Sequence, residues 1–287
     1  SSNASFNFTR DSLKIAMVGK DNNDNLYTSL IIAKLDTTAS NKNNSKKKHA
    51  TKNEIDFGSI HPFVSWSMNG DYLCYSKYHY SVNGSLVWDL RLHNTLTNKT
   101  TWLTNNMRAT YPFFNKKNEI IFVSHSNSIA NLYKIDFENN LTPIPITHFS
   151  EDVQIVSPAI SPNDSLISFG MSKTNGNLDI YTLELDSKDI NRITFHESVD
   201  YLPILTSDGD IFFTSHRTGV PNLFKVDKNN DIVQCTDVAD GLWGIQNFPN
   251  NNSIIANTLN DVDSSRVVSL STDRETNLRE IYINNQY

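Results

Sequence analysis

Cysteine is scarce in this chain of 287 residues, which contains only Cys74 and Cys235. Two thiols cannot form a network of disulfides, and no C-x-x-C pair is present for zinc binding or redox chemistry. The fold must therefore be held together by its hydrophobic core. A chain of this length can bury a sizeable core, in one large domain or two ordinary ones.

Long apolar runs and an excess of positive charge are also missing. No stretch approaches the roughly 18 apolar residues of a membrane-spanning helix. The formal net charge is −6 and the isoelectric point is about 5.7. Nucleic-acid binding would call for a basic surface, so we expect neither a nucleic-acid partner nor a transmembrane segment.

The common local motifs of catalysis are absent as well. The sequence has no G-x-S-x-G nucleophile turn, no H-E-x-x-H zinc helix and no phosphate-binding G-x-x-x-x-G-K-[ST] loop. These absences favour a binding role over an enzymatic one. A site assembled from scattered loops is still compatible with the sequence.

Short apolar segments that follow polar turns recur along the chain. The turns contain Pro, Asn, Asp or Gly, and the segments are rich in β-branched and aromatic residues, as expected for strands entered through tight turns. The turns begin at residues 9, 67, 115, 161, 206 and 248, so the intervals are 58, 48, 46, 45 and 42 residues. A repeat of roughly 45 residues is indicated.

Two further features follow the same period. The first is an aromatic residue in a later strand, at Tyr27, Trp88, Tyr133, Tyr181 and Phe224. The second is a threonine at the end of each unit, at Thr104, Thr147, Thr194 and Thr236. Four strands in each unit of 40–50 residues are typical of a propeller blade, so we predict an all-β, six-bladed β-propeller with four-stranded antiparallel blades.

The predicted propeller is one domain that spans residues 1–287, and we expect it to be a monomer. Residues 1–5 are polar and are interpreted as a tag or a disordered start. Residues 37–54 contain almost no apolar side chain, which predicts a disordered insertion in the first blade and explains the long first interval. The two cysteines fall in the second and fifth blades, opposite each other in a six-blade ring, so both thiols should be free.

The repeat resembles that of the TolB-like β-propellers, which are related to the propellers of prolyl oligopeptidases. The best copy runs from Pro203 to Gly219 and continues to Phe224, and the next best runs from Pro158 to Tyr181. The resemblance covers most of the chain and implies an exported bacterial protein of the periplasm or cell surface that works by binding. It also implies that Arg217 belongs to the structural signature of the repeat.

The candidate ligand-binding site is one mouth of the predicted channel. The segments that join one blade to the next pass from the outer edge of a blade to the axis, so their last residues should gather there. The residues concerned are His61, Arg108, Asp152, Glu197, Asp200, Asp240 and Trp243. Charges beside an aromatic residue at a rim favour a protein or peptide ligand, and no cofactor is expected.

Two alternatives remain open. In the first, His61, His148 and His196 in these joins hold a divalent cation in the channel, and the protein is a metal-dependent polysaccharide lyase or hydrolase. In the second, the propeller is part of a larger peptidase or of an envelope-anchored protein. Fold alone does not decide between them.

Overall fold

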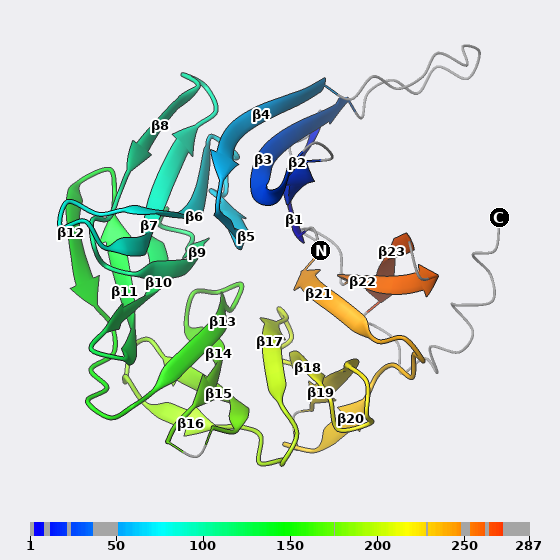
Figure 1. Cartoon of the computed structure of the whole chain (residues 1–287). Helices are drawn as coiled ribbons and strands as arrows, with labels where there is room; N and C mark the ends of the chain where they lie inside the picture. Colours follow the sequence, from blue (N-terminus) through cyan, green and yellow to red (C-terminus); the bar gives the residue numbers. More distant parts are fainter. Residues whose placement is uncertain are drawn as a thin grey trace, which may run out of the picture. The chain divides into compact units, whose positions relative to one another are not determined.

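The computed structural model describes residues 3–8, 12–21, 24–36, 51–174, 176–227, 229–247, 253–261 and 264–271. Within these ranges the chain consists of 23 strands with no helix, so the expected all-β class is confirmed. In particular, the described part contains no helix suited to crossing a membrane. The strands form five four-stranded sheets and one three-stranded sheet (Figure 1).

The chain divides into two units, residues 1–148 and 149–287, and each unit contains three sheets. In the first unit, sheet 1 contains β1 (Asn3–Phe8), β2 (Ser12–Asp21), β3 (Asp24–Asp36) and β4 (Thr51–Gly58); sheet 2 contains β5 (Ile60–Trp66), β6 (Tyr72–Tyr80), β7 (Leu86–Asn94) and β8 (Lys99–Trp102); sheet 3 contains β9 (Ala109–Phe114), β10 (Ile120–Ser126), β11 (Ile129–Asp136) and β12 (Asn140–Pro145).

The second unit repeats this pattern. Sheet 4 contains β13 (Gln154–Ile160), β14 (Leu166–Ser172), β15 (Leu178–Glu184) and β16 (Ile190–Arg192); sheet 5 contains β17 (Asp200–Leu205), β18 (Ile211–Ser215), β19 (Asn222–Val226) and β20 (Ile232–Gln234); sheet 6 contains β21 (Leu242–Asn247), β22 (Ser253–Asp261) and β23 (Ser264–Ser271). Each sheet is an antiparallel meander, in which neighbours in sequence are also neighbours in the sheet.

Four of the six turns that the sequence predicts between first and second strands are present, and those predicted to begin at residues 9 and 248 lie outside the described residues. At Ser67, for example, the backbone N–H donates to the carbonyl of Tyr72 at 2.9 Å, and the Gly70 N–H donates back to Ser67 at 2.9 Å. Equivalent turns begin at Asn115, Ser161 and Thr206. The turn residues therefore fix the start of the second strand in all four sheets.

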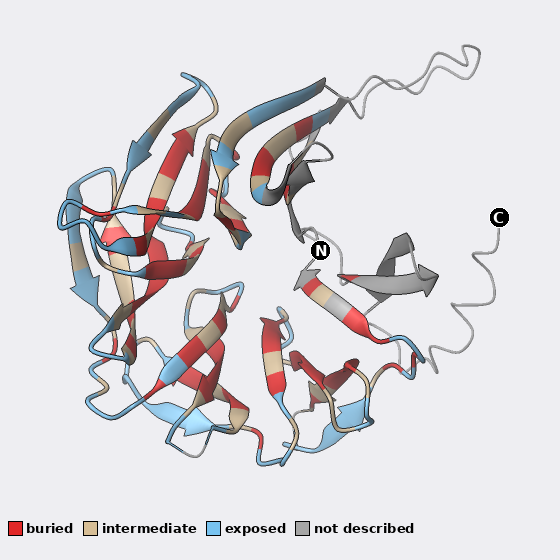
Figure 2. Ribbon diagram, viewed as in Figure 1, coloured by how far each residue is buried: buried red, intermediate tan, exposed pale blue. Residues whose placement is uncertain are grey.

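Within each unit the hydrophobic core lies between consecutive sheets. On β6, Leu73 and Tyr75 pack toward sheet 1, whereas Cys74 packs toward sheet 3. Successive side chains of a strand point to opposite faces, so an uninterrupted apolar strand can be buried on both sides. The burial colours in Figure 2 show the result in sheets 2 to 5: second and third strands are largely buried, and fourth strands such as β12 and β16 are exposed.

Sheets 1 and 2 are also connected by a charged network around Asp56 of β4. Its carboxylate accepts hydrogen bonds from the Tyr75 hydroxyl and the Lys77 ammonium, both at 2.6 Å, and it contacts Arg91. Burial opposes ionisation of Asp56, but the bonds from Lys77 and Tyr75 outweigh it and hold the pKa of this carboxyl below its usual value. Three strands of sheets 1 and 2 are thereby held in register.

Two sequence-based boundaries need correction. Asn3–Ser5, interpreted as a tag or disordered start, belong to β1, where Asn3 pairs with Val18. Residues 51–54, assigned to the disordered insertion, belong to β4, where Glu54 pairs with Ile31. Backbone pairing with a neighbouring strand stabilises polar segments of this kind even without apolar side chains. Residues 37–50 of the predicted insertion lie outside the described residues.

Both cysteines are free, as expected. Cys74 is fully buried, and burial raises the pKa of its thiol. Cys235 is partly buried, and burial raises its pKa to about 11. Both thiols are therefore protonated and unreactive near neutral pH.

Candidate binding surface

A threonine after the fourth strand joins the outer edge of a sheet to its third strand. In sheet 2 the Thr104 hydroxyl accepts a hydrogen bond from the Leu90 N–H at 2.8 Å and donates one to Asp89 at 2.7 Å. The same two bonds connect Thr147 with Leu132 and Asn131, Thr194 with Ile180 and Asp179, and Thr236 with Leu223 and Asn222. The periodic threonine thus has a structural explanation.

The acidic or amide partner of this threonine also holds the segment that leaves the sheet. Asp89 accepts hydrogen bonds from the backbone N–H groups of Asn106 and Met107 at 2.7 and 3.0 Å, and Asn222 accepts one from Val238 at 3.0 Å. Because these groups are buried, the bonds fix where the chain enters the next sheet.

Each first strand after sheet 1 contains an irregularity in its pairing with the second strand. In three of them the residue before a proline has a positive φ: Tyr111 at 53°, Ser157 at 50° and Leu202 at 52°. In β21 Gly244 has a φ of 59° at the corresponding break. Such bulges bend a strand and redirect its side chains, and non-glycine residues adopt this conformation only when the surroundings impose it.

Aromatic side chains gather around this bulge in sheets 2 and 3. The ring centroid of His61 lies 4.7 Å from that of Tyr111, 5.5 Å from that of Trp88 and 5.6 Å from that of Phe63. Trp88 in turn lies 5.1 Å from Tyr78. We call these five side chains the aromatic surface. They come from β5, β6, β7 and β9, so the adjacent sheets of one unit build it together.

Burial determines the chemistry of His61. Its Nδ1 accepts a hydrogen bond from the Phe63 N–H at 3.4 Å, and burial lowers the pKa of the ring to about 4. The imidazole is therefore neutral near pH 7 and can donate through Nε2. Burial also raises the pKa of Tyr111, which keeps its hydroxyl protonated. This surface consequently offers neutral rings and hydrogen-bond donors.

The aromatic surface continues onto the exposed end of the β6–β7 hairpin. Tyr78 pairs with Trp88, and Tyr80 pairs with Leu86, so all four side chains lie on one face of the hairpin. Tyr80 is 72% exposed, and Val82 in the turn is 85% exposed. An apolar strip of this length in solvent is typical of an interaction site.

The sequence prediction of Trp88 as a repeat anchor is wrong in register. Tyr133, Tyr181 and Phe224 each stack on a phenylalanine of the neighbouring strand, two residues after the threonine-bound Asn131, Asp179 or Asn222. In sheet 2 the corresponding residue, two after Asp89, is Arg91. Trp88 instead precedes Asp89 and faces His61 and Tyr78. This displacement frees its ring for the aromatic surface.

The seven residues predicted for the channel mouth have different environments. Arg108, Asp152, Glu197 and Asp240 are exposed, His61 belongs to the aromatic surface, and the side chain of Trp243 lies outside the described residues. Asp200, expected as a rim charge, is fully buried and forms an ion pair with Arg217 at 2.7 Å. The gathering of these residues round one opening stays a prediction.

Arg217 has the structural role that the repeat signature implies. Besides its ion pair with Asp200, its guanidinium lies 5.0 Å from the ring centroid of Phe224 and 5.5 Å from that of Phe213. The Arg217 side chain is only 13% exposed. It therefore neutralises a buried carboxylate.

The histidines considered as metal ligands also differ in environment. His61 is enclosed by rings, whereas His148 and His196 are exposed. The His196 Nδ1 accepts a hydrogen bond from the Ser198 N–H at 3.0 Å. In the part of the chain that the structure describes, no group of three or more His, Cys, Asp or Glu side chains could hold a metal ion.

His61 was expected among the residues of the blade joins, whereas Phe63, Tyr78 and the hairpin tip were not predicted. The signal for the tip was the alternation of Tyr78 and Tyr80 before a Gly84 turn, since alternate residues of a strand share one face. Phe63 carried no comparable signal, because its position depends on the bulge.

Part of the chain is similar in sequence to curated proteins. No family model matches the chain. The Tol-Pal system protein TolB of Francisella tularensis subsp. tularensis (strain WY96-3418) is 28% identical over 133 residues, which are 46% of this chain and 30% of the relative. The match thus spans less than a third of the curated relative's length.

Solved structures extend the likeness over more of the chain. The putative TolB of Agrobacterium tumefaciens aligns with a TM-score of 0.63 and 18% identity over 78% of this chain and 81% of that one. The β-propeller domain of the Trilobed protease from Pyrococcus furiosus aligns with a TM-score of 0.57 and 10% identity over 95% and 94%. At these identities the likeness shows the fold alone, which is that of a β-propeller. The curated relative supports a TolB-like propeller family for this chain, and the solved structures support its propeller fold.

Proposed function

We propose that this chain is a non-catalytic, six-bladed propeller of the bacterial cell envelope that binds a protein or peptide segment through the aromatic surface and the β6–β7 hairpin. The single observation that carries the proposal is the exposed strip of Tyr78, Tyr80 and Leu86 with Val82 at its tip, which continues onto the half-buried Trp88. Tyrosine and tryptophan side chains of this kind are frequent anchors of protein interfaces.

The chemistry of this surface favours a peptide segment that carries apolar or aromatic side chains. Neutral His61 and Tyr111 offer donors to a peptide backbone, while the rings accommodate side chains. The exposed acidic residues predicted for the mouth, Asp152, Glu197 and Asp240, would add attraction for a basic partner. The name of the curated relatives suggests that the partner belongs to a Tol-Pal system, in the periplasm.

Site-specific photocrosslinking in the native cells tests the proposal. A photoreactive residue at Tyr80 should give a discrete adduct, identified by mass spectrometry, and Val82→Asp should abolish that adduct. Leu141 of β12 is the matched control because it is an apolar residue, 59% exposed, in the same unit. A photoreactive residue there should give no such adduct. Equal adducts from both positions would contradict the proposal.

Affinity for the crosslinked partner provides the quantitative test. Loss of a central aromatic anchor should weaken binding about tenfold or more, so we expect this for Trp88→Ala. Leu141→Asp should leave the affinity unchanged. Charge reversal at Asp200 is unsuitable as a test because it would disrupt a buried ion pair.

The alternatives gain less support. A metal-dependent lyase or hydrolase would need a converging donor set, and His61 is surrounded by rings, not by carboxylates. The hypothesis of a propeller within a larger peptidase or envelope-anchored protein stays a prediction, which the full-length gene product tests.

A further inference from the structure

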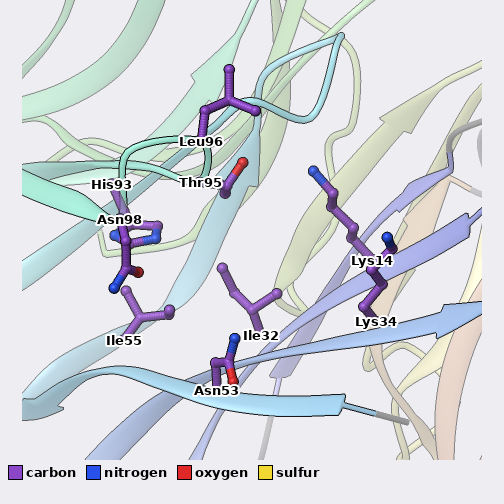
Figure 3. Close-up of a pocket in the computed structure, with 9 residues that line it drawn as sticks. All are labelled: Lys14, Ile32, Lys34, Asn53, Ile55, His93, Thr95, Leu96 and Asn98. Atoms are coloured by element: carbon purple, nitrogen blue, oxygen red, sulfur yellow. The ribbon is translucent and has the colours of Figure 1, made fainter. Parts of the chain in front are cut away.

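A pocket of about 280 Å³ lies in the first unit between sheets 1 and 2, and none of its lining residues belongs to the aromatic surface (Figure 3). Sheet 1 contributes Lys14, Ile32, Lys34, Asn53 and Ile55 to its lining, and sheet 2 contributes His93, Thr95, Leu96 and Asn98. The lining thus contains two ammonium groups, an imidazole, two amides, a hydroxyl and three aliphatic side chains, but no carboxylate.

The two lysines stand directly opposite each other. Lys14 of β2 pairs with Lys34 of β3 across the sheet, and like charges in that arrangement destabilise a sheet. Lys14 donates a hydrogen bond to the Gly70 carbonyl at 2.9 Å, and its nearest acidic influence is Asp71. Lys34 forms no ion pair within the described part of the chain. The positive charge at the pocket is therefore only partly balanced.

The pocket is also lined by polar side-chain groups that have no hydrogen-bond partner among the described residues. His93 is 3% exposed, and its Nδ1 is engaged with the Thr100 hydroxyl at 2.9 Å. For its Nε2, and for the side-chain amides of Asn53 and Asn98, we find no hydrogen bond to any other described residue. The buried His93 ring lines the pocket, so its unpartnered nitrogen is available to a polar ligand there.

We propose that this pocket binds a small organic anion, a carboxylate or a phosphate ester with a short apolar part. The anionic group lies between Lys34 and Lys14 and accepts hydrogen bonds from the amides of Asn53 and Asn98. The apolar part packs on Ile32, Ile55 and Leu96. Binding relieves the repulsion of the opposed lysines, and charged groups of this kind form the stronger class of hydrogen bond.

Titration calorimetry of the whole chain with hexyl phosphate, hexanoate, inorganic phosphate and hexanol tests the site. Hexyl phosphate and hexanoate should bind saturably. Inorganic phosphate should bind more weakly because it lacks the apolar part, and hexanol should not bind because it lacks the charge. Absence of saturable binding by both organic anions overturns the proposal. Equal affinity for inorganic and hexyl phosphate overturns the assigned ligand class.

Three variants locate the site. Lys34→Gln should weaken hexyl phosphate binding about tenfold, the effect of losing one charged hydrogen bond. Asn98→Asp, at a position with a φ of 55° that aspartate tolerates, should weaken it at least as much by placing a negative charge opposite the ligand. Lys52→Gln is the control, because Lys52 is exposed on neighbouring β4 and does not line the pocket. Equal losses in Lys34→Gln and Lys52→Gln would mean general attraction to a positive surface, and the proposal would be wrong.

Discussion

The β6–β7 hairpin of sheet 2 and the β18–β19 hairpin of sheet 5 share a hydrogen bond from the periodic threonine to their third strand, but they differ in length beyond it. Each starts at a residue bound by the periodic threonine, Asp89 in one and Asn222 in the other. Beyond Asn222, which pairs with Ser215, β18 and β19 end. Beyond Asp89 the hairpin continues through three more pairs, up to Tyr80 and Leu86.

The ends of the two hairpins are stabilised by different interactions. In sheet 5 the loop folds back and Arg217 bonds to buried Asp200, so the loop is anchored to the core. In sheet 2 the extra pairs carry apolar side chains into solvent. The comparison indicates that one repeat can supply either a structural loop or an interaction surface, and that hairpin length decides between them.

The largest expected effect on stability is at the β18–β19 hairpin of sheet 5, whose loop is held by Arg217. Arg217→Ala leaves the Asp200 carboxylate buried without its counter-charge, which should lower the free energy of unfolding by about 3–5 kcal/mol. Urea unfolding measures the loss. The double variant with Asp200→Asn should recover a large part of it, because no buried charge is then left unpaired. A single-variant loss below about 1 kcal/mol would show that the loop does not depend on this pair.

The second prediction concerns Asp89, the acceptor of the periodic threonine in sheet 2. Asp89→Ala should lower the free energy of unfolding by about 3 kcal/mol because the buried Thr104 hydroxyl and the part-buried N–H groups of Asn106 and Met107 lose their acceptor. Asp89→Asn should cost less, about 1–2 kcal/mol, since one oxygen remains for Thr104 but an amide group then faces the Asn106 N–H. Asn222→Ala in sheet 5 provides the comparison. Identical losses in Asp89→Ala and Asp89→Asn would contradict this account.

The free energy of unfolding should depend on pH through His61 of the aromatic surface. The folded-state pKa of His61, about 4, lies below the unfolded value near 6.5. The unfolded chain therefore binds more protons between these values, and His61 should cost stability on the order of 2 kcal/mol as the pH falls from about 6.5 to 4. His61→Phe should show a flatter profile in that window. Parallel profiles for the two proteins would refute the buried, neutral state of His61.

The smallest effect on stability is expected at the solvent-exposed tip of the β6–β7 hairpin. Val82→Asp should change the free energy of unfolding by less than about 0.5 kcal/mol because the side chain is 85% exposed. The same change should abolish the Tyr80 crosslink described above. Thermal unfolding and crosslinking of one preparation separate the two effects. A large drop in melting temperature would show that the tip packs against the protein.

Much of the fold could be predicted because its signals are local. The turns at Ser67, Asn115, Ser161 and Thr206 depend on residues next to one another, and the structure contains all four. Thr104 and its counterparts revealed the period although the sequence did not show what they bind. Asp200 was misjudged because its partner, Arg217, is 17 residues away, across a bulged strand pair.

The sequence by itself determined the all-β class, the repeat and the free thiols, since turn residues, alternating apolar side chains and the scarcity of cysteine act at short range. Only the tertiary structure decided which charges are buried, that Trp88 packs with His61 and Tyr78 and not in the stacked core, and that Lys14 and Lys34 line one pocket. These properties depend on strand register and on the bulges. A shift of one residue in register moves a side chain to the opposite face of its sheet.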